Sequence, residues 1–368
     1  MSWRCRPARL RLLRKEINVS ETRKFKIGFI GAGGIALHHM KYLAAMEGVE
    51  IAAAADVSPK SLSKAEEMYK IPKLYTDYKQ MLKERTDLDA VSVCTPNGLH
   101  APAAIAALEA GKHVLVEKPM AMNVAEGQAM LDAAKKAGKH LVVGFQYRFD
   151  AKSFIIRQQI AAGAFGKILF VRCQALRRRG IPNWGVFGRK DLQGGGPLID
   201  IGVHILEMAH YMIGAPRPVA ASGSTFTFLG NQPSDVLSMW PNWDYKSYTV
   251  EDMAIGQVRF ADNAMLHIEA SFVAHIPQDV WNVQIMGEMG GAIWDPIQIF
   301  KDQEGLMANI TPGYVPQWDH FERKMKHFVE VCRDGRKSEA SAEDGLAVQK
   351  MLDGIYASAE AGREVGIE

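Results

Sequence analysis

Three ionisable side chains have types and spacings that suit proton transfer at a carbon–oxygen centre. Lys118 follows Glu117 and precedes Pro119, and Asp200 lies four residues before His204 in a glycine-flanked segment. A histidine titrates near neutral pH and can accept a hydroxyl proton, whereas a lysine ammonium can stabilise a developing oxyanion. If residues 200–204 are helical, Asp200 and His204 share one face, so the aspartate can hold a hydroxyl and orient the base. These residues are predicted to oxidise an alcohol or reduce its ketone.

Each of these residues also has an ordinary structural interpretation. A lysine before a proline is often a surface charge, and Asp200 could simply cap a helix. Lys118 could be the base in place of His204, because a bound cation nearby can lower the pKa of a lysine. From the residues alone, the choice between the two bases stays open.

A glycine-rich turn near the start of the chain predicts a dinucleotide site. The sequence GAGGIA spans residues 31–36, directly after an apolar run. Gly31 suits a tight turn, and Gly33 lets the backbone approach a pyrophosphate. Gly34 and Ile35 then open a helix whose free N–H groups attract phosphate. We therefore expect these four residues to bind the cofactor.

An acidic residue further along predicts which dinucleotide binds. Asp56 ends the second strand-like run, 23 positions after Gly33, where a carboxylate can bind both ribose hydroxyls of NAD. It would repel the 2′-phosphate of NADP, although Lys60 could relieve part of that repulsion. NAD is the expected cofactor, and NADP is the weaker alternative.

The hydrophobic pattern places these residues in a two-domain α/β protein. Short apolar runs alternate with helical patterns over 24–147, which is typical of a doubly wound parallel sheet and predicts a dinucleotide-binding Rossmann domain. Longer β-rich runs follow over 148–368. They predict an α+β domain with a large, mostly antiparallel sheet that binds substrate and makes subunit contacts. Helical patterns cover 318–334 and 341–361.

Composition excludes several other classes of protein. With 48% hydrophobic and 23% charged residues, the chain can form two ordinary cores. The net charge of +3 arises mainly from the N-terminus, so no nucleic-acid partner is expected. The sequence contains no apolar run of 18 residues, so no membrane span is expected. The four cysteines are widely spaced, which predicts neither a metal site nor disulfides and fits the cytoplasm.

Residues 1–23 form a basic segment without the apolar core of a secretory signal. Its first 15 residues contain no acidic side chain, as in a transit peptide. A disordered extension, or a start codon placed too early, is the favoured interpretation.

The glycine loop, Glu117-Lys118-Pro119 and the segment 194–214, which contains Asp200-x-Gly202-x-His204, together resemble the Gfo/Idh/MocA oxidoreductase family. The resemblance runs from about residue 24 to the C-terminus. It implies a sugar, cyclitol or related polyol as substrate, and it implies that Lys118, Asp200 and His204 meet at the nicotinamide. Pro119 resembles a family proline that follows a cis peptide bond.

The resemblance also implies further site residues. It places Glu117 and Lys118, and the side chains that follow the fourth strand-like run, along the cofactor groove. It places Gln146 and two substrate-binding residues at the domain junction. Those following the fourth run are Thr95, Pro96, Asn97 and His100; those at the junction are Tyr147 and Arg148. Trp184, in an arginine-rich loop, could stack on a sugar ring or could be a core tryptophan. His100 and Arg148 could equally be a helix-start histidine and a solvated charge.

Other functions remain open at this point. An NAD-dependent glycosidase is possible within the enzyme class, and a catalytically silent NAD(P)-binding regulator shares the fold. Retention of Lys118, Asp200 and His204 argues against the regulator. A homodimer or homotetramer is expected, because the open face of the second sheet carries apolar residues that another subunit commonly covers.

Overall fold

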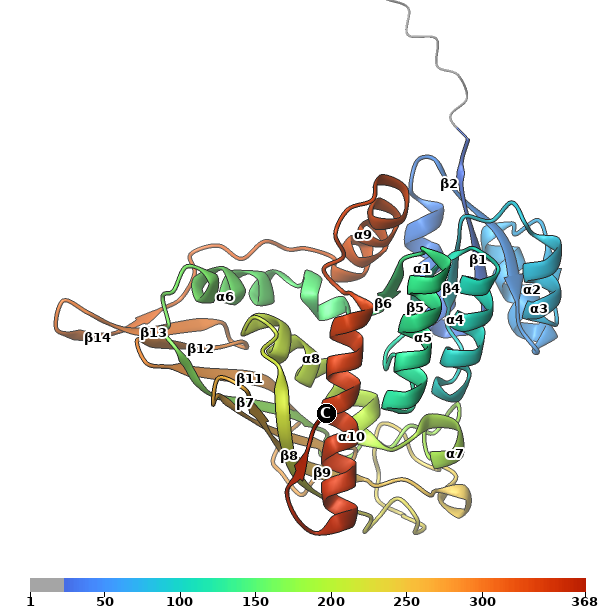
Figure 1. Ribbon diagram of the computed structural model, residues 1–368. Coiled ribbons are helices and arrows are strands. Elements are labelled where there is room, and N and C mark those ends of the chain that lie inside the picture. Colours follow the sequence, from blue (N-terminus) through green and yellow to red (C-terminus); the bar gives the residue numbers. More distant parts are fainter. Residues whose placement is uncertain (1–22) are drawn as a thin grey trace, which may run out of the picture.

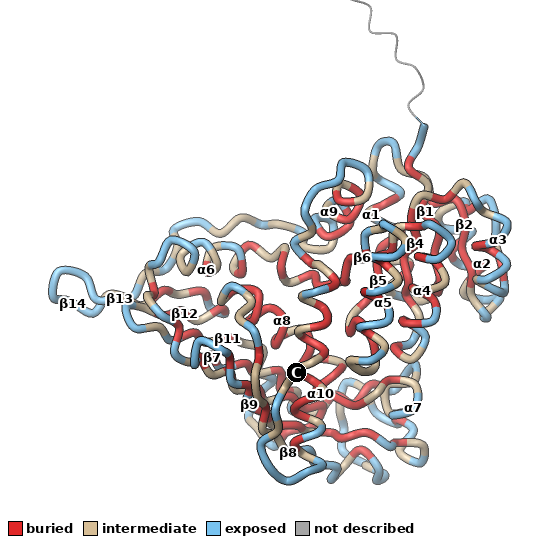
Figure 2. The backbone as a smooth tube through the Cα atoms, viewed as in Figure 1, coloured by how far each residue is buried: buried red, intermediate tan, exposed pale blue. Residues whose placement is uncertain are grey.

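The computed structural model describes residues 23–368, which form two β-sheets of six and nine strands with helices packed on both (Figure 1). The predicted basic extension lies outside the described residues except for Arg23. Figure 2 shows that the buried backbone runs through both sheets and through the helices between them.

The first sheet is parallel, with the strand order β3-β2-β1-β4-β5-β6. The order reverses between β1 and β4, so a crevice forms beyond the carboxyl ends of these two strands, where doubly wound folds bind ligands. The strands are β1 (Phe25–Ile30), β2 (Val49–Ala55), β3 (Leu74–Tyr75), β4 (Ala90–Val93), β5 (His113–Val116) and β6 (Leu141–Val143). The helices between them are α1 (Gly34–Ala44), α2 (Pro59–Tyr69), α3 (Tyr78–Glu84), α4 (His100–Glu109) and α5 (Val124–Ala137).

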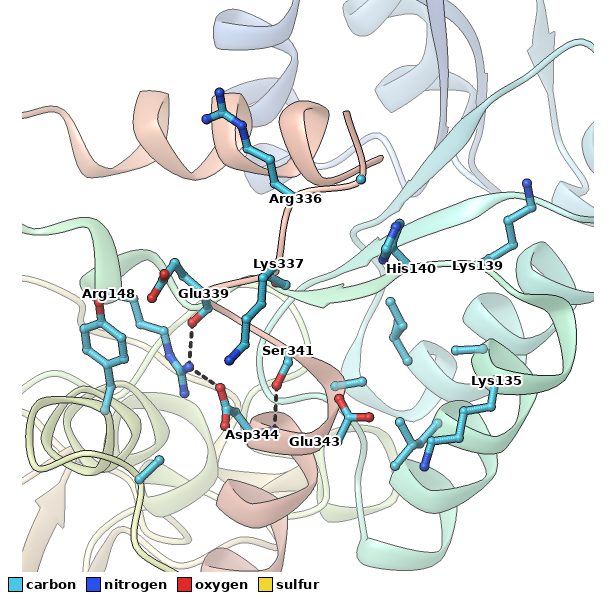
Figure 3. A pocket seen from close by; sticks show the side chains of 18 of the residues that line it. Lys135, Lys139, His140, Arg148, Arg336, Lys337, Glu339, Ser341, Glu343 and Asp344 are labelled. Atoms are coloured by element: carbon cyan, nitrogen blue, oxygen red, sulfur yellow. Dashed lines mark hydrogen bonds and ion pairs between the residues drawn. The ribbon is translucent and has the colours of Figure 1, made fainter. Parts of the chain in front are cut away.

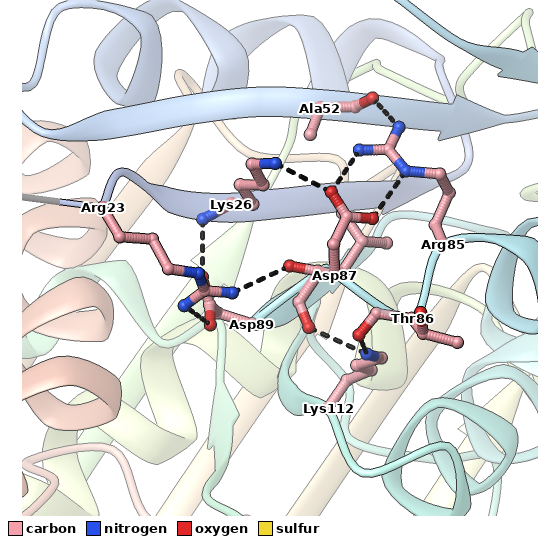
Figure 4. A network of polar contacts seen from close by, with 9 residues as sticks. Arg23, Lys26, Ala52, Arg85, Thr86, Asp87, Asp89 and Lys112 are labelled. Atoms are coloured by element: carbon pink, nitrogen blue, oxygen red, sulfur yellow. Dashed lines mark hydrogen bonds and ion pairs between the residues drawn. The ribbon is translucent and has the colours of Figure 1, made fainter.

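A polar network fixes the amino end of β1 (Figure 4). Arg23 donates to Asp89 at 2.8 Å, and the Lys26 ammonium lies 2.9 Å from Asp87. Arg85 forms a second ion pair with Asp87, and this hydrogen-bonded pair holds the pKa of that carboxyl below its usual value. The contacts tie the first strand to the segment that leads into β4, which sets the alignment of the crevice strands.

The second sheet is mixed but mainly antiparallel, with the order β14-β13-β12-β11-β7-β10-β9-β8-β15; of its pairings in the described chain, only β7 with β10 is parallel. Its strands are β7 (Ile168–Leu176), β8 (Pro218–Phe226), β9 (Met253–Phe260), β10 (Met265–Ser271), β11 (Val280–Gly287), β12 (Gly290–Ile293), β13 (Gln298–Gln303), β14 (Leu306–Ile310) and β15 (Val365–Gly366). The expected fold class, a Rossmann sheet followed by a large antiparallel sheet, is confirmed.

Helices cover one face of the second sheet and reach back to the first (Figure 1). Along β9 and β10 every second residue is buried, because alternate side chains face the helical layer. That layer contains α6 (Ala151–Ala161), α8 (Val203–Met212) and α10 (Ala342–Ala361), and the short α7 (Lys190–Gln193) contacts the turn just before α4. Helix α9 (His320–Asp334) instead packs on α1.

The C-terminal half also completes the edge of the first sheet. Val142 in β6 forms an antiparallel bridge with Ser341, and the Val143 amide donates to the Ala340 carbonyl at 3.0 Å. The edge strand of the parallel sheet is therefore covered by backbone from just before α10, which removes an open strand edge.

Candidate active site

The glycine turn leaves space for a phosphate at the start of α1. Gly31 has a φ of +91°, and a Cβ there would lie 2.4 Å from the Cys94 carbonyl oxygen, so glycine is required. Next to Gly33 and Gly34, by contrast, a Cβ would meet no atom within 4 Å, and no side chain caps the helix. The first helical N–H groups thus face open space, which fits a pyrophosphate.

Asp56 lies directly after β2, beside the glycine turn. Its carboxylate accepts hydrogen bonds from the backbone amides of Ala32 at 2.6 Å and Ser58 at 2.8 Å. These contacts fix the carboxylate at the carboxyl end of the strand and leave lone pairs for further donors. This position fits the ribose hydroxyls of a dinucleotide.

The segment after β4 forms the adjoining wall. Thr95 places a buried hydroxyl oxygen there that has no hydrogen-bond partner among residues 23–368, and Pro96 is exposed. The Asn97 amide donates to the Gln193 carbonyl at 2.9 Å. An unsatisfied buried hydroxyl is rare and points toward an external partner, so Thr95 is the member of this set with a polar atom available to the cofactor.

His100, the first residue of α4, lies behind the groove and connects two of its backbone segments. Its two ring nitrogens lie 2.7 Å from the Pro119 carbonyl oxygen and 3.0 Å from that of Thr95, and burial lowers its pKa. The predicted direct contact with the cofactor is thereby corrected, because the ring connects two backbone segments of the groove and is 1% exposed.

The structure also corrects the predicted cofactor contact of Glu117. Its side chain turns away from the glycine turn into the packing between α1 and α9. There one carboxylate oxygen lies 2.6 Å from the ammonium of Lys324 and 3.0 Å from the imidazole of His39. A residue paired in this way is a structural neighbour of the site.

Lys118 joins the two halves of the site. It follows β5, and its ammonium donates to the Asp200 carbonyl at 2.9 Å and to the Asp200 carboxylate at 3.1 Å. The Lys118–Pro119 bond is cis, as the family resemblance implies. Asp200 lies in a π-helical turn (Leu198–Gly202) that leads into α8, and such turns are frequent at functional sites.

His204 lies in the first turn of α8, one turn beyond Asp200. Its Nδ1 is buried without a hydrogen-bond partner in the described chain. Burial, followed by the charge of Lys118, holds its pKa well below 6.5. A neutral imidazole can accept a proton. The expectation that Asp200 orients this ring is wrong in detail, since the Asp200 carboxylate binds Lys118 instead.

Tyr147 packs against His204 and is the centre of an aromatic cluster. Its ring centroid lies 5.7 Å from those of His204 and Trp281 and 5.5 Å from that of His320. Burial raises the pKa of Tyr147 to about 12, so its hydroxyl stays protonated and can donate a hydrogen bond. The predicted substrate residue Tyr147 therefore lies beside His204.

Sequence reasoning missed Trp281 and His320. Trp281 comes from β11, and its indole N–H is another buried donor without a partner in residues 23–368. His320 begins α9, at a position where a polar residue is ordinary. The aromatic content of the β11 segment was a usable signal, whereas nothing local distinguishes His320.

Arg177 and two tryptophans extend the site along the loop after β7. The Arg177 guanidinium lies 4.9 Å from the Trp240 ring centroid; burial lowers its pKa, and the nearby Asp200 carboxylate opposes that shift. Trp184 packs edge-on against Trp240 at 4.8 Å and is half exposed. Trp184 is thus a surface residue of an aromatic wall, and the core interpretation is wrong.

Arg148 points toward the Glu339 carbonyl and the Asp344 carboxylate, just before and within the first turn of α10 (Figure 3). Its guanidinium is 3% exposed and forms ion pairs with Glu207 at 2.9 Å and Asp344 at 2.6 Å, and it also donates to the Glu339 carbonyl. It lines a separate cavity of about 870 Å³ between α5 and the start of α10. Its Nε and Nη1 bind these protein acceptors, whereas its Nη2 is buried without a partner among the described residues. The substrate contact of Arg148 therefore stays a prediction.

The site combines the neutral imidazole of His204, the phenol of Tyr147, and the Lys118 ammonium that the Asp200 carboxylate holds. These groups lie beside a groove whose shape fits a dinucleotide. Among residues 23–368, no group of three or more histidine, cysteine, aspartate or glutamate side chains could hold a metal ion. In the same residues, no helix is both long and apolar enough to cross a membrane. The chemistry available is proton transfer at a hydroxyl next to a redox cofactor.

Comparisons with known families agree with this geometry. Residues 25–145 match the family described as "Oxidoreductase family, NAD-binding Rossmann fold". Residues 155–293 match the "GFO/IDH/MocA C-terminal domain". The first match covers every strand of the parallel sheet, and the second covers β7 to β12 of the larger sheet.

Individual relatives are similar over nearly the whole chain. D-glucoside 3-dehydrogenase of Escherichia coli is 35% identical over 92% of this chain and 97% of its own length. Levoglucosan dehydrogenase of Pseudarthrobacter phenanthrenivorans is 30% identical over 90% of this chain and 95% of its own. The solved structure of a levoglucosan dehydrogenase with NADH has a TM-score of 0.80 at 25% identity, covering 94% of this chain and 99% of that one.

Proposed function

Because this chain belongs to the Gfo/Idh/MocA oxidoreductase family, we propose that it transfers a hydride between NAD and a secondary hydroxyl or keto group of a sugar or related polyol. The observation that carries the proposal is the Lys118–Asp200 clamp beside the neutral His204, at the edge of the glycine-turn groove. The similarity to a glucoside dehydrogenase and a levoglucosan dehydrogenase favours a pyranose ring as substrate.

The residues that would hold NAD are those whose geometry leaves room or free hydrogen-bonding groups. They are Gly33, Gly34 and Ile35 at the pyrophosphate, Asp56 at the adenosine ribose, and Thr95 along the groove. Bound there, NAD would supply the hydride acceptor for oxidation of the carbinol carbon. All proton movements fall to the side chains of this chain.

The side chains divide the proton chemistry between them. His204 accepts the proton of the reacting hydroxyl, because its imidazole is neutral and its Nδ1 has no partner in the described residues. Lys118 places its ammonium beside the oxygen and stabilises the negative charge that develops there. Asp200 holds that ammonium and accepts a hydrogen bond from a neighbouring substrate hydroxyl, and Tyr147 can donate one. The protein thereby binds, orients and deprotonates a polyhydroxylated ring.

A substrate screen tests this function. Purified protein is mixed with NAD and a panel of glucosides, anhydrosugars, aldoses and inositols, and NADH absorbance is followed. Turnover on at least one pyranoside or anhydrosugar is expected. Tight NADH binding with no turnover anywhere on the panel would instead support the regulator, and release of a free sugar without net NADH would support the glycosidase.

We expect NAD to bind at least about 10-fold more tightly than NADP, since a close carboxylate opposes a doubly charged 2′-phosphate. The Asp56 carboxylate is fixed by Ala32 and Ser58 and cannot easily swing away. Fluorescence titration with NADH and NADPH measures both constants. Asp56→Ala should bring the NADH and NADPH dissociation constants closer together. Tighter binding of NADPH than of NADH by the wild type would contradict the predicted preference for NAD.

We further propose a cytoplasmic homodimer or homotetramer. The uncovered face of the second sheet exposes Leu169 on β7 and Met286 on β11, at 46% and 48%, and apolar residues on an open sheet face favour a subunit contact. Cys94, Cys173 and Cys332 are free thiols, as is usual in a reducing compartment. Light scattering that gives a monomer at micromolar concentration would contradict the oligomer.

A further inference from the structure

A buried charge cluster lies directly behind the proposed oxyanion-stabilising lysine. It consists of Glu117 after β5, Lys324 from α9, and His39 from α1, with Ser92 of β4 beneath. The Lys324 ammonium lies 2.6 Å from Glu117 and 3.0 Å from His39 Nε2, and His39 Nδ1 lies 3.1 Å from the Ser92 hydroxyl. All four are buried, with Lys324 at 1% and His39 at 0% exposure. Lysine is almost never fully buried unless it is paired.

Burial and the neighbouring charges set the protonation of the cluster. His39 Nε2 lies 3.0 Å from both the Lys324 ammonium and a Glu117 carboxylate oxygen, and its Nδ1 lies 3.1 Å from the Ser92 hydroxyl, so both ring nitrogens have partners in either neutral tautomer. Burial, reinforced by the Lys324 charge, lowers the pKa of His39 to about 4. Burial alone would raise the pKa of Glu117, but Lys324 and His39 together outweigh it and keep the pKa of that carboxyl low. The cluster therefore contains one cation, one anion and a neutral imidazole.

The cation comes from a distant part of the chain. Lys324 is 207 residues from Glu117, on a helix that packs against α1, and its ammonium also lies 4.8 Å from the Phe321 ring centroid. Within the described residues, His39 is neutral and no other cationic side chain lies within 4 Å of the Glu117 carboxylate. The charge balance behind β5 thus depends on α9.

The cluster reaches the catalytic lysine through the backbone. The second Glu117 carboxylate oxygen accepts from the Lys118 amide at 3.3 Å, while the Lys118 side chain extends to the opposite side and meets Asp200. A carboxylate held in place on one side therefore fixes the peptide from which the ammonium projects on the other.

We propose that Lys324 and His39 are positioning residues, which hold the Glu117 carboxylate so that it fixes the Lys118 backbone and aims the ammonium at Asp200 and the substrate oxygen. The inference rests on the proposed function for the role of Lys118. Without Lys324, the buried carboxylate takes up a proton or turns toward solvent, because an unpaired charge is costly there. Either change loosens the contact to the Lys118 amide.

The first experiment uses Lys324→Met, which keeps the length and apolar stem of the side chain. The exposed Lys326→Met on the same helix is the matched control. Acetylation of individual lysines, followed by peptide mass spectrometry without substrate, reports whether Lys118 is still held by Asp200. We expect Lys118 to react several-fold faster in Lys324→Met and at the wild-type rate in the control. Lys112, whose ammonium binds the carbonyls of Thr86 and Leu88, serves as the internal reference.

The second readout is steady-state kinetics with a substrate from the screen. We expect kcat to fall about 10-fold with little change in the KM for NAD, since small displacements of a reacting group lower the rate steeply. A lower unfolding midpoint with wild-type Lys118 labelling and wild-type kcat would show that Lys324 only stabilises the fold, and would overturn the proposal.

If Lys324→Met does not fold, the double variant Glu117→Gln with Lys324→Met takes its place, because it leaves no buried charge unpaired. Faster Lys118 labelling in that variant supports the proposal, and unchanged labelling contradicts it. Labelling needs no substrate, so it remains informative even if the screen finds no turnover and the proposed function fails.

Discussion

Replacing His204 with alanine is expected to lower turnover by about 100-fold or more, the usual scale for a lost general base. The structure gives this histidine a neutral imidazole, a buried Nδ1 without a partner in residues 23–368, and a place one helical turn from Asp200. Cofactor affinity should change little, because His204 is not part of the glycine-turn groove. The measurement is kcat with the best substrate of the screen, together with the NADH dissociation constant.

Controls and pH separate the two candidate bases. The exposed histidine variant His140→Ala should keep wild-type turnover. Lys118→Ala should also lose about 100-fold, through loss of charge stabilisation at the oxygen. A base must be neutral, and the pKa of His204 is held below 6.5, so oxidation by the wild type should persist below pH 6.5. If oxidation by the wild type slows as soon as the pH drops out of the alkaline range, the base is Lys118. Near-normal turnover by His204→Ala would lead to the same assignment.

The variant Asp200→Asn tests the ion pair between Lys118 and Asp200. The carboxylate holds the Lys118 ammonium at 3.1 Å, and the amide would lose the charge of that contact. Turnover and substrate affinity should therefore fall together. Loss of turnover alone, at unchanged KM, would show that Asp200 does not bind the substrate.

Replacing Arg148 with methionine is expected to destabilise the protein by about 3–5 kcal/mol, the range for removing one partner of a buried ion pair. Arg148 is 3% exposed and Glu207 is fully buried, and their atoms are 2.9 Å apart. Urea unfolding measures the change. Arg336→Met is the matched control, since Arg336 forms an exposed ion pair with Glu330 and should contribute less than about 1 kcal/mol.

The stability lost in Arg148→Met should increase with pH. Burial already raises the pKa of Glu207 to about 7, and removal of Arg148 would raise it further. A carboxyl whose pKa is raised by folding lowers the stability of the folded state once the pH exceeds its unfolded pKa, and this penalty grows until the pH has passed the folded pKa. Arg148→Met should therefore be closer to wild type at pH 5 than at pH 8. A variant of normal stability with a raised KM for the sugar would instead support Arg148 as a substrate residue.

Local patterns in the sequence predicted most of the first sheet and its cofactor turn. The glycines of 31–36 and the acidic residue Asp56 are recognisable because strand, turn and helix follow one another without interruption. The helical pairing of Asp200 and His204 was also predictable from their spacing. The π-helical turn at Asp200 was not, since a one-residue expansion of a helix changes no visible period.

Long-range contacts are the part that the sequence did not reveal. The family resemblance places Glu117 along the cofactor groove, and nothing local in the sequence shows that its carboxylate turns inward. Arg148 has acidic partners 59 and 196 residues away, at Glu207 and Asp344. A signal for Lys324 did exist, since it lies on the same helical face as Phe321 and Phe328, where a charge requires a buried partner.

The return of the C-terminal half to the first sheet has a consequence for how the chain is made. Ala340 and Ser341 cover the edge of β6, and Lys324 neutralises Glu117 behind β5. A ribosome releases β5 and β6 some 200 residues before these partners, at roughly 5–20 residues per second. The nascent Rossmann half therefore waits on the order of ten seconds or more with an open edge and a carboxylate that lacks its cation. Folding of the newly made chain should therefore depend on chaperones. Chains truncated before Lys324 should behave like this unpaired Rossmann half.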